Sequence, residues 1–189
     1  MAEYDRGIHI IGGIKMKQKI DVMEYAGKIL KETGKGVLLT TKADGKVNTM
    51  TIGWGTLGLE WGKPIFTAFV RKSRYSWELL QKNPEFTVNI PYGDYDKTIL
   101  GLCGTRSGRD VDKLGQLGLT EVASETVAVP GIKELPLTLE CKVIYQQDQD
   151  PAAVSQEDTA KFYPKNEIFP EGDYHTAFYG QITAAYIIK

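Results

Sequence analysis

Hydrophobic and polar residues alternate along several short segments of the chain, which predicts a protein built mainly from β-strands. The clearest alternation runs from Leu137 to Tyr145, where every second residue is apolar and the side chains between them are mostly polar. The pair Asp44-Gly45 separates two β-prone runs and predicts a tight hairpin. The six expected strands cover 37–41, 47–53, 64–70, 85–90, 136–146 and 175–188.

Short helices are expected between these strands. Asp21 supplies a capping oxygen for the first helix and Ser73 for the second, and Asn83-Pro84 ends the second. Two further helices are expected to begin at Asp94 and Asp110. The four helices would cover 25–32, 74–82, 94–103 and 110–117. Strands joined by hairpins or single short helices favour a mainly β protein, a six-stranded antiparallel barrel with peripheral helices, over a βαβ series.

The chain has 189 residues, and we expect it to form one domain over 1–189. Residues 1–20 would form an N-terminal arm. The stretch 147–173 is polar and contains three prolines, with a short helix expected after Ser155. It is interpreted as an insertion between the last two strands.

Composition limits the class of protein further. The 23 Lys and Arg residues nearly balance 24 Asp and Glu, which argues against a protein that neutralises a nucleic-acid backbone. Two cysteines are too few for a disulfide scaffold and favour a reducing compartment. Apolar runs such as 65–70 are far shorter than the ~20 residues of a membrane span. We therefore expect a soluble, cytoplasmic protein that does not enter membranes.

One glycine motif is excluded as a nucleotide site. Gly53-Trp-Gly-Thr-Leu-Gly58 matches the spacing of a dinucleotide fingerprint, but that mechanism needs a helix to begin at once. Here Gly62 and Pro64 predict a turn instead. The chain also has no phosphate-binding G-x-x-x-x-G-K-[ST] motif.

The segment Arg71-Lys-Ser-Arg-Tyr-Ser76 is the strongest candidate for binding chemistry. It lies between the end of a strand and the first turn of a helix, where free backbone N–H groups favour an anion. Three cations and two hydroxyls make phosphate the natural ligand. A solvated surface helix capped by Ser73 explains the same residues about equally well. The basic turn 105–110, with Lys113 after it, is a weaker second candidate because Asp110 would compete with an anion.

Other kinds of site find little support. Cys103 would lie near the C-terminal end of a helix, where the dipole opposes a thiolate, and Cys141 falls on an apolar strand face. The two histidines and two cysteines have no zinc-like spacing, so no metal site is predicted. Trp54 and Tyr75 lie close in sequence to the basic turn, a combination that suits a planar ring with a phosphate tail, although core packing explains aromatic residues equally well.

Four motifs together resemble the flavin reductase-like, FMN-binding split-barrel family, with flavoredoxins as the most similar subgroup. They are Asn48-Thr-Met-Thr-Ile-Gly-Trp-Gly55, Val70-Arg-Lys-Ser-Arg-Tyr-Ser76, Phe86-Thr-Val-Asn-Ile-Pro91 and Ser107-Gly-Arg-Asp-Val-Asp-Lys113. The resemblance runs from about 37 to 142 and resumes over 175–185.

The resemblance implies a homodimer of split barrels with FMN at the subunit interface. The strand carrying Asn48 would follow the isoalloxazine ring, the turn 71–76 would hold the phosphate, and Lys113 and His175 would contact the flavin. Arg74 stands where the subgroup often has a small hydroxyl residue, and 147–173 is longer than expected. The resemblance implies a cofactor site made of Asn48, Thr49, Met50, Thr51, Trp54, Arg71, Ser73, Arg74, Tyr75, Ser76, Ser107, Lys113 and His175.

The leading functional hypothesis is an FMN-dependent oxidoreductase that takes electrons from NAD(P)H and passes them to a small-molecule or protein acceptor. The flavin carries the chemistry, so no side chain is predicted to be catalytic. A flavoredoxin-like electron carrier or FMN-binding module without its own NAD(P)H site remains an alternative. A flavin-free oligonucleotide-binding barrel is disfavoured by the charge balance.

Overall fold

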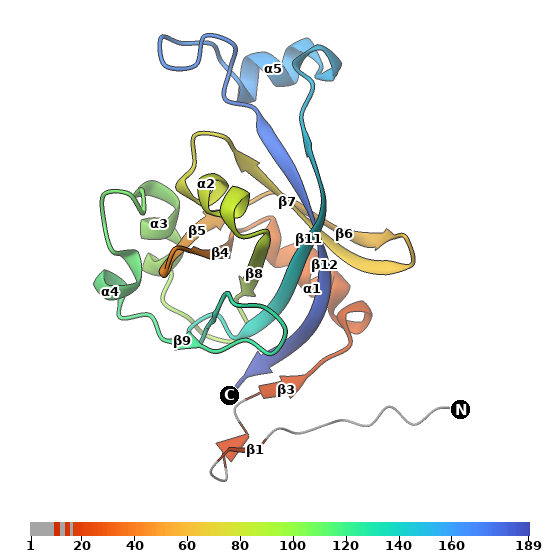
Figure 1. The fold of residues 1–189 in the computed structure, drawn as a ribbon, viewed down its shortest axis with the longest axis vertical. Coiled ribbons are helices and arrows are strands. Elements are labelled where there is room, and N and C mark those ends of the chain that lie inside the picture. Colours follow the sequence, from red (N-terminus) through yellow and green to blue (C-terminus); the bar gives the residue numbers. More distant parts are fainter. Residues whose placement is uncertain (1–9, 12–13, 16) are drawn as a thin grey trace.

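A computed structural model describes residues 10–11, 14–15 and 17–189 (Figure 1). Its main element is an eight-stranded antiparallel sheet, in which seven strands follow the order β5-β4-β8-β11-β12-β7-β6 and β3 also pairs with β12. The strands are β3 (Lys17–Lys19), β4 (Val37–Ala43), β5 (Lys46–Ile52), β6 (Gly55–Glu60), β7 (Lys63–Arg71), β8 (Glu85–Ile90), β11 (Leu137–Asp148) and β12 (His175–Ile188). The mainly β antiparallel prediction is confirmed, with β3 and β6 added to the six expected strands.

Tight turns connect the paired strands at both ends of this sheet. Asp44 and Gly45 have φ angles of 52° and 73°, which is the geometry expected of a two-residue hairpin between β4 and β5. Trp61 and Gly62 repeat that geometry between β6 and β7, with φ angles of 50° and 71°. Because the chain continues from Gly53 into β6, the glycine motif opens no helix, and the exclusion of a dinucleotide fingerprint is confirmed.

Helices pack around the sheet (Figure 1). Asp21 accepts a hydrogen bond from the backbone N–H of Met23 and caps the first helix as expected. The helix expected from Asp94 begins only at Thr98, and Asp112 rather than Asp110 caps the next one by accepting from the Gly115 N–H. The helices are α1 (Val22–Thr33), α2 (Tyr75–Lys82), α3 (Thr98–Thr105), α4 (Lys113–Leu117) and α5 (Gln156–Phe162).

Four short strands lie outside the main sheet. The pairs are β1 (Ile10–Ile11) with β2 (Ile14–Lys15), and β9 (Glu121–Val122) with β10 (Gly131–Ile132). The expected N-terminal arm over 1–20 falls partly outside the described residues, since 1–9, 12–13 and 16 are not among them.

The main core fills the inside of the curved sheet. Phe66, Phe86 and Phe178 are fully buried there, and Cys141 is equally buried, as its place on an apolar strand face predicts. Gly180 makes this packing feasible, because a Cβ at that position would lie 2.4 Å from the Phe86 ring. A second cluster joins Leu38 of β4 to Ile99 and Cys103 of α3 and Leu114 of α4.

The segment between β11 and β12 extends beyond the barrel. It contains a one-turn helix over Pro151–Ala153 and α5, which follows the expected cap Ser155 (Figure 1). Since β11 continues to Asp148 and β12 begins at His175, we name residues 149–174 the outer segment. Its contacts with the turn before α2 bring it into the candidate site.

Candidate functional site

The N-terminus of α2 lies at the centre of the candidate site. β7 ends at Arg71 and α2 begins at Tyr75, so the segment 71–76 forms a strand-to-helix turn as predicted. The N-cap residue of α2 is Arg74, so the expected cap Ser73 was wrong, and no side chain forms a capping hydrogen bond there. The backbone N–H groups of Tyr75 and Ser76 and the positive end of the helix dipole are therefore available to an anion, whereas the Trp77 N–H donates to the Arg74 carbonyl.

A pocket at this helix end brings most of the predicted site residues together. We call it the basic pocket, because four cationic residues are among those that line it. It lies where β5, the turn before α2 and the loop between α3 and α4 converge. Its lining residues are Asn48, Met50, Thr51, Ser73, Arg74, Tyr75, Ser76, Cys103, Gly104, Arg106, Ser107, Gly108, Arg109 and Lys113.

A buried hydrogen bond joins β5 to α2 inside this pocket. The Asn48 side-chain amide donates to the Ser76 hydroxyl over 2.9 Å, and both side chains are buried. Gly108 packs directly against the same amide, since a Cβ there would lie 1.9 Å from Asn48 Oδ1. The site therefore depends on a close approach of the loop that only glycine allows.

Lys113 connects α4 to the backbone of β5. Its buried ammonium group donates hydrogen bonds to the carbonyl oxygens of Thr49 at 2.9 Å and Cys103 at 3.1 Å. Burial lowers the pKa of Lys113, and the nearby charge of Arg74 lowers it further. Burial raises the pKa of the Cys103 thiol to about 11, so this cysteine stays protonated at neutral pH. Thr49 thus contributes its carbonyl to the site without lining the pocket.

Three arginines line the basic pocket. Arg109 donates to the Ser73 carbonyl over 3.1 Å, forms an ion pair with Glu78 and lies over the Tyr75 ring, so it ties the loop to α2. Arg74 and Arg106 are exposed, and among the described residues neither has a recorded side-chain hydrogen bond or ion pair. Neither Arg106 nor Arg109 was among the predicted site residues, although the basic turn 105–110 was the signal for both.

Arg71 lies apart from the basic pocket. Its guanidinium donates to the carbonyl oxygens of Asp173 at 2.7 Å and Phe162 at 2.9 Å, and it lies 5.1 Å from the Tyr163 ring centroid. All three contacts belong to the outer segment. The structure therefore uses Arg71 to hold that segment against the end of β7.

Asp173 occupies donors at the turn where the sequence predicted an anion. Its carboxylate accepts a 2.6 Å hydrogen bond from the Ser73 hydroxyl and a 3.3 Å bond from the Ser73 backbone N–H. No local pattern in the sequence points to this residue, because it lies 100 positions from Ser73. A carboxylate of the chain itself thus lies at the edge of the basic pocket.

Trp54 and His175 form a second part of the predicted site, next to Arg71. Their ring centroids are 5.1 Å apart, and Trp54 also meets Phe162 of the outer segment edge-on at 5.0 Å. The Tyr163 hydroxyl and His175 Nδ1 share a 2.9 Å hydrogen bond. Burial, with the Arg71 charge as a second cause, lowers the pKa of His175 to about 4, so its ring is neutral at pH 7.

Over the described part of the chain, no three His, Cys, Asp or Glu side chains come together as a metal site would require. None of the helices in that same part combines the length and the apolar character needed to traverse a bilayer.

The fold and the basic pocket define a class of antiparallel split barrels that present a cationic, hydroxyl-rich turn at a helix N-terminus. A family model described as flavin reductase like domain matches residues 32–189. The chain belongs to this family, and the split-barrel prediction is confirmed.

Two flavoredoxin structures are similar to this chain. Flavoredoxin of Desulfovibrio vulgaris (Miyazaki F) has a TM-score of 0.61 and 25% sequence identity, covering 82% of this chain and 69% of its own. Flavoredoxin from Methanosarcina acetivorans has a TM-score of 0.61 and 30% identity, covering 82% and 68%. An uncharacterized protein of Archaeoglobus fulgidus is 35% identical over 99 residues, which cover 52% of this chain and 55% of that protein. The chain spans little more than half the length of the curated relatives it matches.

Proposed function

We propose that the protein is an FMN-binding oxidoreductase of the flavin reductase type, which passes electrons from NAD(P)H through bound FMN to an acceptor. The observation that carries this proposal is the basic pocket, where most of the residues expected to contact the flavin meet at the uncapped N-terminus of α2. The family match over 32–189 supports a flavin as the ligand.

The donor set at the basic pocket suits the phosphate of FMN. Arg74 and Arg106 supply exposed guanidinium groups, and Ser76 and Ser107 line the pocket with hydroxyls. Together with the first N–H groups of α2, these groups match the charge and the acceptor oxygens of a phosphate dianion. We assign Arg71 a supporting role through the outer segment, because its guanidinium already binds two carbonyl oxygens.

The ring of the flavin would extend along β5 from the phosphate end towards Trp54 and His175. When bound, the flavin supplies the redox chemistry, and the protein supplies orientation and electrostatics. Lys113 holds a positive charge against the Thr49 carbonyl on β5 and stabilises negative charge on a neighbouring ligand. His175 is neutral near pH 7, so it adds an aromatic face without a competing cation.

We further propose that residues 1–189 act as one domain and that two copies enclose the flavins as a homodimer. The exposed face of Trp54, with 41% of its surface accessible, is available to a second copy. Sedimentation of the FMN-loaded protein measures the assembly directly. A monomer that retains stoichiometric FMN contradicts the interfacial position of the flavin.

A flavoredoxin-like electron carrier is the second candidate function. The likeness to two flavoredoxins, at 25% and 30% identity, favours it. The carrier would bind FMN in the same pocket but would receive electrons from another protein instead of from NAD(P)H.

The test is the visible spectrum of the purified protein followed by rapid mixing. We expect flavin absorbance after incubation with FMN and desalting, and loss of that absorbance on mixing with NADH or NADPH. Bleaching by dithionite but by neither nicotinamide identifies the carrier. A protein that retains no FMN refutes both candidates.

A further inference from the structure

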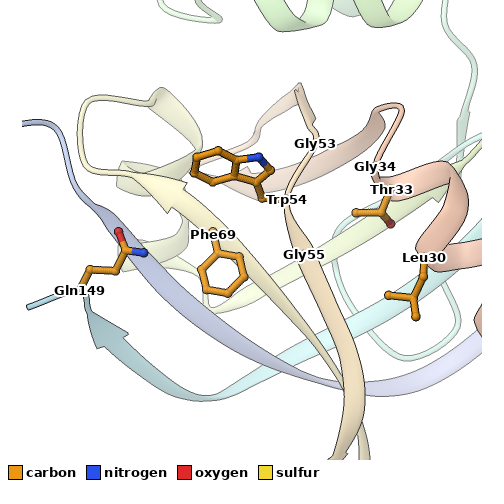
Figure 2. A pocket seen from close by; sticks show the side chains of 8 residues that line it. All are labelled: Leu30, Thr33, Gly34, Gly53, Trp54, Gly55, Phe69 and Gln149. Atoms are coloured by element: carbon orange, nitrogen blue, oxygen red, sulfur yellow. The ribbon is translucent and has the colours of Figure 1, made fainter. Parts of the chain in front are cut away.

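A second cavity lies beside Trp54 (Figure 2), and none of its lining residues lines the basic pocket. It has a volume of about 390 Å³, within the range of sites for small organic ligands. Of the predicted site residues, Trp54 alone lines it. We call it the aromatic cavity, and its lining residues are Leu30, Thr33, Gly34, Gly53, Trp54, Gly55, Phe69 and Gln149.

The walls of the aromatic cavity carry no charged side chain. Trp54 and Phe69 lie on one side of β6, and Leu30 and Thr33 of α1 lie on the other (Figure 2). The Thr33 hydroxyl donates to the Ile29 carbonyl within its own helix, so it is not a free donor. Aromatic and aliphatic walls without charge favour an uncharged planar ring.

Gln149 provides one polar group with a defined orientation. Its side-chain oxygen accepts a 3.1 Å hydrogen bond from the His175 backbone N–H. Because the oxygen faces that N–H, the orientation of the amide is fixed and its nitrogen is directed away from it. That nitrogen points towards Phe69 (Figure 2), and over the described residues it has no recorded partner. The cavity therefore offers a donor to a carbonyl oxygen.

We propose that the aromatic cavity binds an uncharged planar ring bearing a carbonyl oxygen, as part of an electron donor or acceptor. This inference rests on the proposed function, because Trp54 also contacts His175 at the ring end of the proposed flavin site. A ring held against Trp54 would lie beside the flavin. Quinones and the carboxamide-bearing nicotinamide ring share this chemistry.

Gly53 allows the cavity to be filled without disturbing the fold. A Cβ at Gly53 meets no atom within 4 Å, and its φ lies outside the left-handed region. Gly53→Val therefore adds a branched side chain at a residue that lines the cavity, without a clash at its Cβ. Gly58 has the same freedom but does not line the cavity, so Gly58→Val is the matched control. Gln149→Glu keeps the oxygen that accepts from His175 and replaces the amide donor with an acceptor.

The experiment measures ligand binding to the flavin-free protein by saturation-transfer NMR. The probes are menadione, nicotinamide, and 2-methylnaphthalene, which resembles menadione without its carbonyls. We expect menadione or nicotinamide to bind. The probe with the lower dissociation constant identifies whether the ligand of the cavity is a quinone or a nicotinamide. Gly53→Val should raise that dissociation constant at least about tenfold, whereas Gly58→Val should change it less than about twofold. Gln149→Glu should weaken the binding of the carbonyl probe but not the binding of 2-methylnaphthalene.

Riboflavin titration separates this inference from the proposed function. If Gly53→Val abolishes riboflavin binding, the cavity belongs to the flavin and the inference is overturned. It is also overturned if neither carbonyl probe binds, or if Gly53→Val leaves their binding unchanged. If the parent binds a carbonyl probe but no flavin, the proposed function fails while the cavity remains a ring site.

Discussion

Two arginines of the turn 71–76 have different contacts and should therefore affect flavin binding differently. Arg74 lines the basic pocket and is exposed, whereas Arg71 donates to two carbonyl oxygens of the outer segment. Arg74→Ala should therefore weaken FMN binding and leave riboflavin binding unchanged, because riboflavin has no phosphate. Arg71→Ala should weaken both ligands alike, because it loosens the outer segment.

The magnitudes follow from what each guanidinium contacts. A hydrogen bond to a charged group contributes about 1.5–3 kcal/mol, and exposure places Arg74 near the lower limit, which is about tenfold in FMN affinity. The free energy of unfolding should change by less than about 0.5 kcal/mol, as for other exposed positions. Arg71→Ala removes two short hydrogen bonds, at 2.7 and 2.9 Å, and should cost about 2–4 kcal/mol of stability.

Fluorescence titration with FMN and riboflavin, together with urea unfolding, measures these effects. Lys72→Ala is the matched control, since Lys72 is an exposed cation of the same turn whose ammonium pairs with Asp148 at 2.6 Å. It should leave both affinities unchanged. The reasoning is refuted if Arg74→Ala weakens riboflavin as much as FMN, or if the phosphate-specific loss appears with Arg71→Ala instead.

Three further substitutions or conditions test the surroundings of the site. Asp173→Asn removes a negative charge from Ser73, so FMN should bind about threefold to tenfold tighter in titrations while riboflavin is unaffected. His175 has a pKa of about 4 in the folded protein and 6.5 in the unfolded chain, so its contribution to stability is complete above pH 6.5. Urea unfolding should show that the free energy of unfolding falls by about 3 kcal/mol as the pH drops from 6.5 to 4. Gly108→Ala forces a methyl group against the Asn48 amide, so thermal unfolding should show a loss above about 2 kcal/mol, and both flavins should bind less.

Each of these expectations has a control or a contradicting outcome. The control for Gly108→Ala is Gly101→Ala, because Gly101 lies in α3 and the added methyl group meets nothing within 4 Å. This variant should stabilise the protein by up to about 1 kcal/mol. His175→Gln should flatten the acid limb of the stability profile, and an unchanged limb would show that another group titrates there. Unaltered FMN affinity in Asp173→Asn would place the phosphate away from Ser73.

Local signals predicted the elements that build the basic pocket. The hairpin turn at Asp44-Gly45 is a short-range feature encoded by glycine. The strand end before α2 was also predicted at the right place, but with Ser73 as a cap that the structure does not show. β6 escaped prediction because its sequence is rich in glycine and largely exposed, so its strand conformation comes from pairing with β7. The capping shift from Asp110 to Asp112 is equally local, since both carboxylates precede the same helix.

The contacts of the outer segment could not be read from the sequence. Asp173 reaches Ser73, and Arg71 reaches Phe162, across separations of 100 and 91 residues. Such pairs depend on the register of β12 against β7, which sets His175 opposite Arg71. The motif around Arg71 therefore predicted a basic turn correctly as local structure but could not reveal that two of its cations, Arg71 and Lys72, already have partners.

The outer segment links the two cavities through its own ends. Near the N-terminal end of the segment, Gln149 lines the aromatic cavity and accepts a hydrogen bond from the His175 backbone. Near the C-terminal end, Asp173 accepts a hydrogen bond from Ser73 at the edge of the basic pocket. Phe162 contacts Trp54 between them. Because one segment carries all three contacts, a phosphate that displaces Asp173 would also change how the segment holds Gln149. Ring binding should then differ between the FMN-loaded and the flavin-free protein.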